Sequence, residues 1–182
     1  WGGLAVRERL EERRDRGVDE ENGGARGGSN GFAISAVALV AVGAYAGSSH
    51  VGVDSLVFQF AFSGAVAAAL ADTFSSEFGG LFDSPRLITT LEPVDPGTDG
   101  GVTWQGAVAG AVGSGVIAVL GALFFGFGAL VTAAILAAGF LGMVADSVLG
   151  ATLEGDRIGN QSVNLLATLL AGLGAATVAL VV

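Results

Sequence analysis

The sequence predicts an all-α membrane protein, a polytopic bundle of about five transmembrane helices. Of its 182 residues, 52% are hydrophobic and only 14% are charged, and the mean hydropathy is +0.68. A soluble domain carries about 25% charged residues. Several apolar segments approach or exceed the roughly 18 to 20 residues that cross a bilayer as a helix. A soluble protein with a very apolar core is the alternative, but it would need surface charge that this chain lacks.

The charged residues are strongly acidic and include no lysine. The chain contains seventeen Asp and Glu residues and eight basic residues, all of them Arg, so the formal net charge is -9. An acidic surface without lysine is typical of proteins from halophiles, in which carboxylates keep the surface hydrated, and it suggests a haloarchaeal source. Cysteine is absent, which excludes disulfides and thiolate metal sites.

The N-terminal segment, residues 1–31, differs from the rest of the chain. Residues 4–16 alternate acidic and basic side chains and predict a short solvated helix end, and residues 17–31 are too rich in glycine for a helix. No signal-peptide pattern is present. Because the sequence starts at Trp1, we expect a fragment or a processed product that lacks upstream helices.

The transmembrane domain is expected over residues 32–182. The third and fourth of its apolar segments are separated only by "GFG", which predicts a tight helical hairpin. Between the second and third lies a long segment, 72–103, that holds all three prolines, and a second loop is expected at 150–161. The five predicted spans are residues 32–48, 54–71, 104–125, 128–149 and 162–182.

Arginine placement predicts the orientation. Six arginines precede the first span, Arg86 lies in the 72–103 loop and Arg157 in the 150–161 loop. With five spans these three segments lie on one side, and the connections around His50 and Gly126, on the other side, contain no arginine. The positive-inside rule therefore predicts a multi-pass protein of the cell membrane with these loops in the cytoplasm.

The polar residues fall in five clusters, all at the predicted cytoplasmic ends of helices or in the cytoplasmic loops. Clusters that gather on one membrane face are expected to form the walls of a single site. They occupy residues 22–31, 71–79, 87–103, 142–155 and 160–172.

Carboxylates near the ends of apolar helices are the strongest candidates for chemistry. Asp72 and Asp146 each lie near such an end, and Glu77 follows Asp72 by five residues. Placing an ionisable side chain at membrane depth costs free energy, so its presence there indicates a functional site. Oxygen ligands from several helices suit Mg²⁺, which binds carboxylates together with substrate phosphates. The alternative is that these residues only cap helices or mark the membrane interface. Ser147, beside Asp146, is included as a nucleotide-binding hydroxyl.

The stretch "PGTDGG", residues 96–101, predicts an anion-binding turn. Backbone N–H groups in a glycine-bearing turn just before a helix cradle phosphates without lysine. The candidate groups are Gly97, Thr98, Gly100 and Gly101. An ordinary interfacial turn is the alternative, and the absence of GK[ST] excludes a Walker A loop.

For three further polar residues, the sequence leaves more than one role open. Arg26, flanked by glycines, either contacts a phosphate or only sets the topology. Asn160 and Asn164 are four residues apart and share a helix face if the helix starts early enough. Asn160 is then either part of the site or a helix cap. Asn164, inside an apolar helix, is expected to bind metal, phosphate or another helix.

In this order the clusters resemble the motifs of one membrane protein family, DUF92. Residues 71–79, "ADTFSSEFG", are similar to its A-D-T-W-A-S-E-x-G, and residues 87–106 contain a close match to its G-T-x-G-G-V. The remaining similar stretches are "GVDEENGGARGGSNG" (17–31), "GMVADSVLGATLEG" (142–155) and "NQSVNLLATLLAG" (160–172). The departures are Phe74 for Trp, Glu154 for Gln and a shortened loop after Arg26.

The resemblance implies a lipid enzyme. The family includes a plant phytyl-phosphate kinase and is related to CTP-dependent lipid kinases and cytidylyltransferases. It therefore implies an integral membrane isoprenyl-phosphate kinase, with a phytyl or geranylgeranyl monophosphate as acceptor and CTP or another NTP as donor. In that reaction Asp72, Glu77 and Asp146 would hold Mg²⁺ on the nucleotide. Arg26 and Asn164 would orient the acceptor phosphate, and the 97–101 turn would bind phosphate.

Three other functions are weighed against the kinase. Cytidylyl transfer to a lipid phosphate would use the same metal and turn but release pyrophosphate. An ion-coupled transporter would use the carboxylates to bind its cation, yet the polar residues do not form a path across the bilayer. A structural membrane protein leaves the clusters unexplained. A nucleic-acid partner is not expected, because the chain has no basic aromatic patch.

Overall fold

The computed structural model describes residues 31–52, 54–153, 158–179 and 181–182. The predictions for the segment before residue 31, including the role of Arg26, lie outside these residues, as does the position of Arg157.

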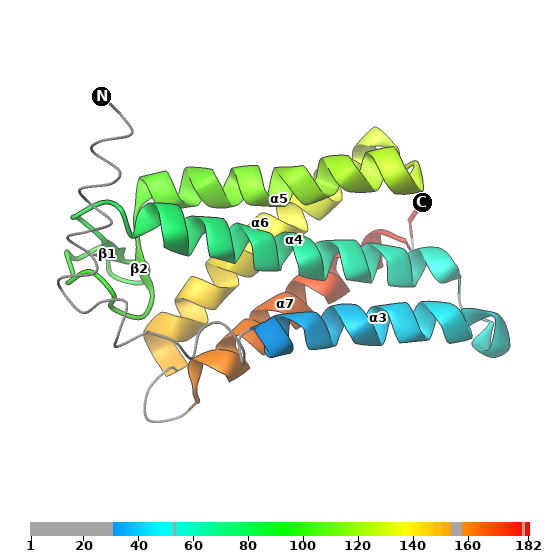
Figure 1. Cartoon of the computed structure of the whole chain (residues 1–182), viewed down its shortest axis with the longest axis horizontal. Helices are drawn as coiled ribbons and strands as arrows, with labels where there is room; N and C mark the ends of the chain where they lie inside the picture. Colours follow the sequence, from blue (N-terminus) through cyan, green and yellow to red (C-terminus); the bar gives the residue numbers. More distant parts are fainter. Residues whose placement is uncertain (1–30, 53, 154–157, 180) are drawn as a thin grey trace.

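The described residues form an all-α bundle, as predicted, with a small two-stranded sheet at one end (Figure 1). Four of its helices are long and apolar enough to cross a membrane, and α3 contributes a shorter apolar stretch, Ser35–Ser48. The helices are α3 (Gly31–Val51), α4 (Ser55–Gly79), α5 (Trp104–Phe125), α6 (Ala129–Leu153) and α7 (Asn160–Val178). The strands are β1 (Arg86–Leu87) and β2 (Gly101–Val102), which pair antiparallel.

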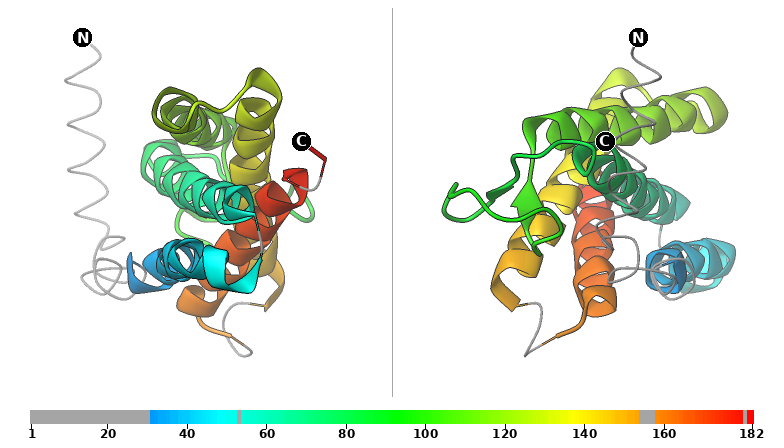
Figure 2. Two further views of the ribbon diagram at one scale, coloured as in Figure 1. Left: turned by 90° about the vertical axis from the view of Figure 1, so that its right-hand side faces the viewer. Right: turned by 60° about the vertical axis from the view of Figure 1, so that its left-hand side comes forward.

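Helix α4 is the centre of the bundle. It packs against each of the other four helices. Helices α3, α4 and α5 lie roughly side by side, and α6 and α7 cross behind them at an inclination (Figures 1 and 2). Consecutive helices run in opposite directions, so that the β1–β2 segment, the end of α6 and the start of α7 lie at one end of the bundle (Figure 1). We call this the loop end. The α5–α6 turn lies at the opposite end, the hairpin end.

Helix α4 is longer than the sequence predicted. Residues 72–79 were assigned to a loop, but α4 continues through them to Gly79, and Gly80 N–H then bonds to the carbonyl of Ser76 at 3.0 Å. No proline interrupts this stretch, and the first proline of the chain is Pro85. The first acidic cluster is therefore the last two turns of a helix, and the loop that follows starts at residue 80.

The other boundaries shift by smaller amounts. Helix α6 extends to Leu153 and α7 starts at Asn160, earlier than the predicted residue 162. Helix α3 extends to Val51, so that His50 lies in its last turn. The predicted span 104–125 coincides with α5.

Small residues let the helices approach closely. A Cβ added at Gly142 in α6 would lie 2.7 Å from the Cβ of Ala68 in α4 and 2.8 Å from the Cβ of Ala171 in α7. A Cβ at Gly113 in α5 would lie 2.8 Å from the carbonyl oxygen of Leu70. Such contacts are how helices associate in lipid, where apolar burial gives little driving force. Gly113 and Gly142 are therefore packing residues.

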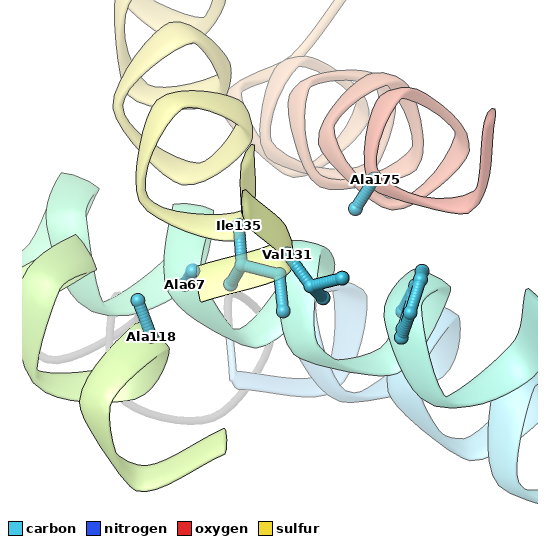
Figure 3. Packing of buried hydrophobic residues seen from close by; sticks show 6 residues of the cluster. Ala67, Ala118, Val131, Ile135 and Ala175 are labelled. Carbon is cyan, nitrogen blue, oxygen red and sulfur yellow. The ribbon is translucent and has the colours of Figure 1, made fainter. Parts of the chain in front are cut away.

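The larger apolar side chains gather toward the hairpin end. Val131 and Ile135 of α6 project between α4 and α7 (Figure 3). Phe127, in the α5–α6 turn, packs edge-on against the ring of Phe60 with the centroids 5.1 Å apart. The cluster comprises Phe60, Ala67, Ala118, Val131, Ile135 and Ala175.

Candidate functional site

Three helices meet around Gly142. Its neighbours are Ala68 of α4 and, on α7, Ala171 and the carbonyl oxygen of Ala167, which lies 3.4 Å from an added Cβ. Helices α4 and α6 run toward the loop end here and α7 runs away from it (Figure 1). This junction sets the register between the helices that carry the candidate residues.

Asp72, Asp146 and Asn164 all lie on the loop-end side of this junction. Asp72 and Asp146 follow Ala68 and Gly142 by four residues, which advance about 6 Å along a helix and turn about 40° around it. On α7, which has the opposite direction, Asn164 precedes Ala167 by three residues and Ala171 by seven. The two carboxylates therefore lie about one turn beyond the junction, and Asn164 lies between one and two turns beyond it.

The burial of these residues matches an interior site near the membrane surface. Asn164 is only 6% exposed, whereas Asp72 and Asp146 are half-buried. The Oδ1 atom of Asp146 is buried. Burying a polar group in such a position costs free energy of folding. Such groups are therefore retained where they serve a function or make hydrogen bonds. That several clusters line one site stays a prediction.

Glu77 does not belong to this group by position. It is exposed, and five residues place it about 140° around α4 from Asp72. The residues that the structure describes contain no set of three Asp, Glu or His side chains that could hold a metal ion. The expected three-carboxylate set is therefore reduced to the pair Asp72 and Asp146. Glu77 lies at the end of α4, toward solvent.

Asn160 is not the helix cap that the sequence left open. The N-cap of α7 is Gly159, which makes no side-chain cap hydrogen bond. Asn160 instead uses its side-chain oxygen to accept a 2.6 Å hydrogen bond from Nδ2 of Asn164. One turn further, the buried Thr168 hydroxyl donates to the Asn164 backbone carbonyl at 2.7 Å. A polar stripe thus follows the buried face of α7 from the loop end.

The 97–101 turn is held by its own hydrogen bonds. Gly97 and Gly100 have φ values of 91° and 73°, which favour glycine. The N–H of Thr98 donates to Asp95 and that of Gly101 donates to Thr98, at 3.2 and 2.9 Å. Two of the four N–H groups expected to bind an anion, those of Thr98 and Gly101, are therefore used within the turn. The Thr98 hydroxyl also donates to the Asp95 carbonyl, at 2.7 Å.

This turn lies against the last turns of α6. A Cβ at Gly100 would approach the backbone N and Cα of Ala151 to 2.7 Å. Ser147 is one turn before Ala151, and its hydroxyl donates to the carbonyl of Met143 at 3.3 Å, which leaves its oxygen able to accept. The glycine-rich turn and the carboxylate pair thus share α6 as their support.

Helices α4 and α5 are joined beside the site. Thr103 caps α5, its hydroxyl accepting from the N–H of Gly106 at 3.1 Å and reaching the carbonyl of Gly79 at 3.5 Å. A Cβ at Gly106 would lie 2.8 Å from the carbonyl of Ser75. The last turns of α4, which carry the first acidic cluster, are therefore fixed against the start of α5.

The donor set fits Mg²⁺ bound together with a substrate. Mg²⁺ is usually held by one or two carboxylates, with water and phosphate oxygens completing the octahedron. Asp72 and Asp146 supply two carboxylates from different helices, and Asn164 adds an amide. Three protein ligands at most would leave positions open for phosphates.

Thr168 was missed from the sequence, and Asn160 was assigned only as one of two alternatives. The signal for both was the spacing of Asn160, Asn164 and Thr168, each four residues apart and therefore on one helix face. A polar stripe on a buried face requires internal hydrogen bonds, and the structure supplies them.

Comparison with known proteins places the chain among membrane proteins. The sequence model of the family described as "Integral membrane protein DUF92" matches residues 1–172. No solved structure matches the chain.

Three relatives illustrate the similarity. An uncharacterized membrane protein of Methanocaldococcus jannaschii is 46% identical over 110 residues, which is 59% of this chain and 46% of the relative. Protein PGR of Arabidopsis thaliana is 41% identical over 104 residues, 50% of this chain and 36% of the relative. An uncharacterized membrane protein of Synechocystis is 32% identical over 158 residues, 84% of this chain and 59% of the relative. The aligned regions thus span about a third to three fifths of these relatives.

Proposed function

The chain belongs to the DUF92 family of integral membrane proteins, and from that premise we propose that it is a magnesium-dependent isoprenyl-phosphate kinase. The substrate would be a lipid monophosphate, such as phytyl or geranylgeranyl phosphate, and the donor CTP or another nucleoside triphosphate. The resemblance of the motifs to a phytyl-phosphate kinase suggests this reaction. The arrangement of the site supports it.

The observation that carries the proposal is the position of Asp72 and Asp146, each one turn beyond the Gly142 junction on helices that pack together, with the buried Asn164 on the third helix of that junction, toward the loop end. Carboxylates from two helices at the end of an apolar bundle suit the binding of a cation together with phosphates. A structural role alone does not require both carboxylates at one level. A transporter would need charged or ion-coordinating groups further into the membrane. The buried polar side chains deeper in α4 and α5 are instead the uncharged hydroxyls of Ser63 and Ser114, and that of Ser114 donates to the carbonyl of Leu136 at 2.8 Å.

The reaction requires little from the protein beyond charge and position. An oxygen of the acceptor phosphate attacks the γ-phosphorus, the bond to the β-phosphate oxygen breaks, and the nucleoside diphosphate leaves with the bond electrons. The acceptor oxygen is already ionised, so no strong general base is needed. Phosphoryl transfer depends mainly on neutralisation of charge and on in-line geometry. Mg²⁺ held by Asp72 and Asp146 would supply the neutralisation.

The surroundings provide for both substrates. The 97–101 turn, supported by Ala151, would lie over the nucleotide phosphates, with Ser147 nearby as a hydrogen-bonding group. An isoprenyl tail would remain in the bilayer beside the apolar outer faces of the helices, which expose residues such as Val108, Val112 and Leu141. The loop end would face the cytoplasm, where nucleotides are found.

The test uses purified protein in lipid at high salt with geranylgeranyl phosphate, Mg²⁺ and CTP labelled at the γ position. The kinase transfers label to a lipid diphosphate, and Asp72→Asn and Asp146→Asn abolish the transfer. Asp83→Asn, at an exposed position in the loop after α4, is the matched control and retains activity. Release of labelled pyrophosphate would instead identify a cytidylyltransferase. Neither product, with CTP or ATP and several prenyl phosphates, would refute both enzyme functions.

A further inference from the structure

Helix α5 has exposed apolar side chains along the whole of its outer face. Its first residue, Trp104, is 73% exposed, and Phe124, near its other end, is 79% exposed. Between them Val108, Val112 and Val116 are also exposed, at intervals of four residues. Because the chain belongs to a family of integral membrane proteins, this face is the surface of α5 that contacts lipid.

The length of this face determines its position in the bilayer. Trp104 precedes Phe124 by 20 residues, which is about 30 Å of helix, and the hydrocarbon core of a bilayer is equally thick. No more length is available at the hairpin end, because Gly126 ends the helix with a φ of 72° and α6 starts at Ala129. The face therefore spans the core only if Trp104 lies at the membrane surface of the loop end.

Close packing relates each level of α5 to a level of α4. A Cβ added at Gly106 would lie 2.8 Å from the carbonyl oxygen of Ser75, and one at Gly110 would lie 3.1 Å from that of Ala71. The two helices run in opposite directions, so four residues forward along α5 correspond to four residues back along α4.

This register relates the lipid-facing surface to the first carboxylate. Trp104 comes two residues before the first of these contacts and lies close to the level of Phe78, whereas Val108 lies close to the level of Asp72. Val108 is exposed, so lipid contacts α5 at the level where α4 has its carboxylate. The apolar run of α4 ends at residue 71, but the lipid-facing surface of its neighbour continues to Trp104.

A membrane surface at the level of Asp72 is the alternative, and it leaves α5 too short. Ala109, at that level, precedes Phe124 by 15 residues, about 23 Å of helix. This length is about 7 Å less than the hydrocarbon core, and any tilt of α5 would shorten it further. The alternative would also place the exposed ring of Trp104 in water.

Two phenylalanines lie close to Trp104 at the loop end. The N–H of Phe82 bonds to the carbonyl of Gly79 at 3.1 Å, and the hydroxyl of Thr103 approaches the same carbonyl at 3.5 Å. Phe78 and Phe82 are exposed, like Trp104. Tryptophan favours the headgroup region, since its ring is apolar and its N–H is polar. We call these three residues, Phe78, Phe82 and Trp104, the aromatic cluster.

We propose that the aromatic cluster contacts the lipid headgroup region and marks the membrane surface at the loop end. Asp72 precedes Phe78 by six residues, so it lies about 9 Å along α4 on the membrane side of this surface. The membrane-embedded part of α4 thus extends beyond residue 71, where its apolar run ends. The inference does not depend on the proposed function, because it concerns only the position of the bilayer.

The fluorescence of Trp104 tests its depth. The chain contains two tryptophans, so Trp1→Phe leaves Trp104 as the single one. The variant is reconstituted in vesicles with lipids brominated either near the headgroup or near the chain ends, and acrylamide is the quencher in water. We expect bromines near the headgroup to quench Trp104 more strongly than those near the chain ends.

A tryptophan in the loop after α4 is the control. Glu92 is exposed there, and Glu92→Trp is made in a background with Trp1→Phe and Trp104→Phe. Acrylamide should quench this control strongly and the bromolipids weakly. Equal acrylamide quenching of Trp104 would place the cluster in water and overturn the inference. Protection of Trp104 from both quenchers would mean that protein covers it, such as a second copy of the chain, and would overturn it as well.

Cysteine labelling tests the level of Asp72. The chain has no cysteine, so Val108→Cys introduces a single thiol at an exposed position near that level. The thiolate is the reactive form, and it forms in water but not in lipid. A membrane-impermeant maleimide on both sides of the vesicles should therefore label Val108→Cys at least about tenfold more slowly than Glu92→Cys.

Two controls exclude other causes of slow labelling. Val108 is exposed in the protein, so slow labelling does not arise from burial against another helix, and in denaturing detergent both variants should react alike. Equal labelling in the membrane would place the level of Asp72 in water and overturn the inference. Neither measurement involves nucleotide or metal, so the outcome is independent of the kinase assay.

Discussion

The two ends of the bundle use the same helices for different purposes. Toward the hairpin end the helices pack with large apolar side chains, such as Phe60, Phe127 and Ile135. Beyond the Gly142 junction, toward the loop end, they carry Asp72, Asp146 and Asn164. Between the two lies a zone of alanine and glycine that brings the backbones together. The hairpin end stabilises the bundle, and under the proposed function the loop end would carry the chemistry at some expense in stability.

The largest effect expected concerns the carboxylate pair. Asp72→Asn or Asp146→Asn should lower kcat by about a hundredfold or more, because a metal ion contributes several kcal/mol to the transition state. The midpoint of thermal unfolding should stay the same or rise, since a charge in an apolar region is removed. The γ-phosphate transfer assay and circular dichroism measure both quantities. A large loss of stability would make these residues structural.

Gly142→Ala should lower both the stability of the bundle and the activity of the site. Its Cβ would lie under 3 Å from the Cβ atoms of Ala68 and Ala171, and overpacking of this kind destabilises by about 1–3 kcal/mol. Because this junction also sets the level of the carboxylates, activity should fall with stability.

The matched control for this substitution lies on α7. Gly174→Ala meets nothing within 4 Å, and alanine favours a helix over glycine by about 1 kcal/mol. It should therefore be neutral or slightly stabilising in thermal unfolding in detergent. Equal effects of Gly142→Ala and Gly174→Ala would contradict the junction as described.

Gly100→Ala tests the turn alone. The φ of 73° and the contact with Ala151 both disfavour a side chain, so the turn should move away from α6. We expect KM for the nucleotide to rise about tenfold, a loss of about 1.4 kcal/mol, with a small change in kcat. Gly52→Ala carries a similar strain at φ 69° with open space around it. It should leave KM unchanged in the same assay.

The smallest effect is expected at the hairpin end. Phe127→Ala removes the edge-on pair with Phe60, and such pairs contribute about 0.5–1.5 kcal/mol beyond burial. Thermal unfolding should shift down accordingly, while kcat per folded molecule stays constant. A selective loss of kcat would mean that the two ends are not separable.

The sequence predicted the fold well because hydropathy and helix length are local properties. Helix α5 was placed to the residue, and the common end of the loop after α4, the end of α6 and the start of α7 followed from the alternating directions of successive spans. The end of α4 was missed, because polar residues 72–79 read as loop although they continue a helix. Hydropathy indicates which residues favour the lipid, but a helix can continue beyond an apolar run into polar residues. The end of the apolar run is therefore not the end of the helix.

The site residues stay a prediction, although their position at one end of the bundle could be expected from the sequence. The register of Asp72, Asp146 and Asn164 depends on contacts between helices far apart in sequence. Glu77 was grouped with Asp72 by its proximity in the chain, and the helical turn separates them. The link between Asn160 and Asn164 was visible only as a spacing, because an asparagine at a helix start has a local alternative as a cap.

The central position of α4 determines when the site can be completed during synthesis. Asp72 is on the second described helix, Asp146 on the fourth and Asn164 on the last. Until the ribosome has released α7 and the membrane has accepted it, α4 lacks one of the neighbours that cover it. In that interval Asp72 is tolerable because it lies two turns from the end of α4, within reach of interfacial water. Helix α4 thus gains its cover from α7 only after the other described helices have been synthesised.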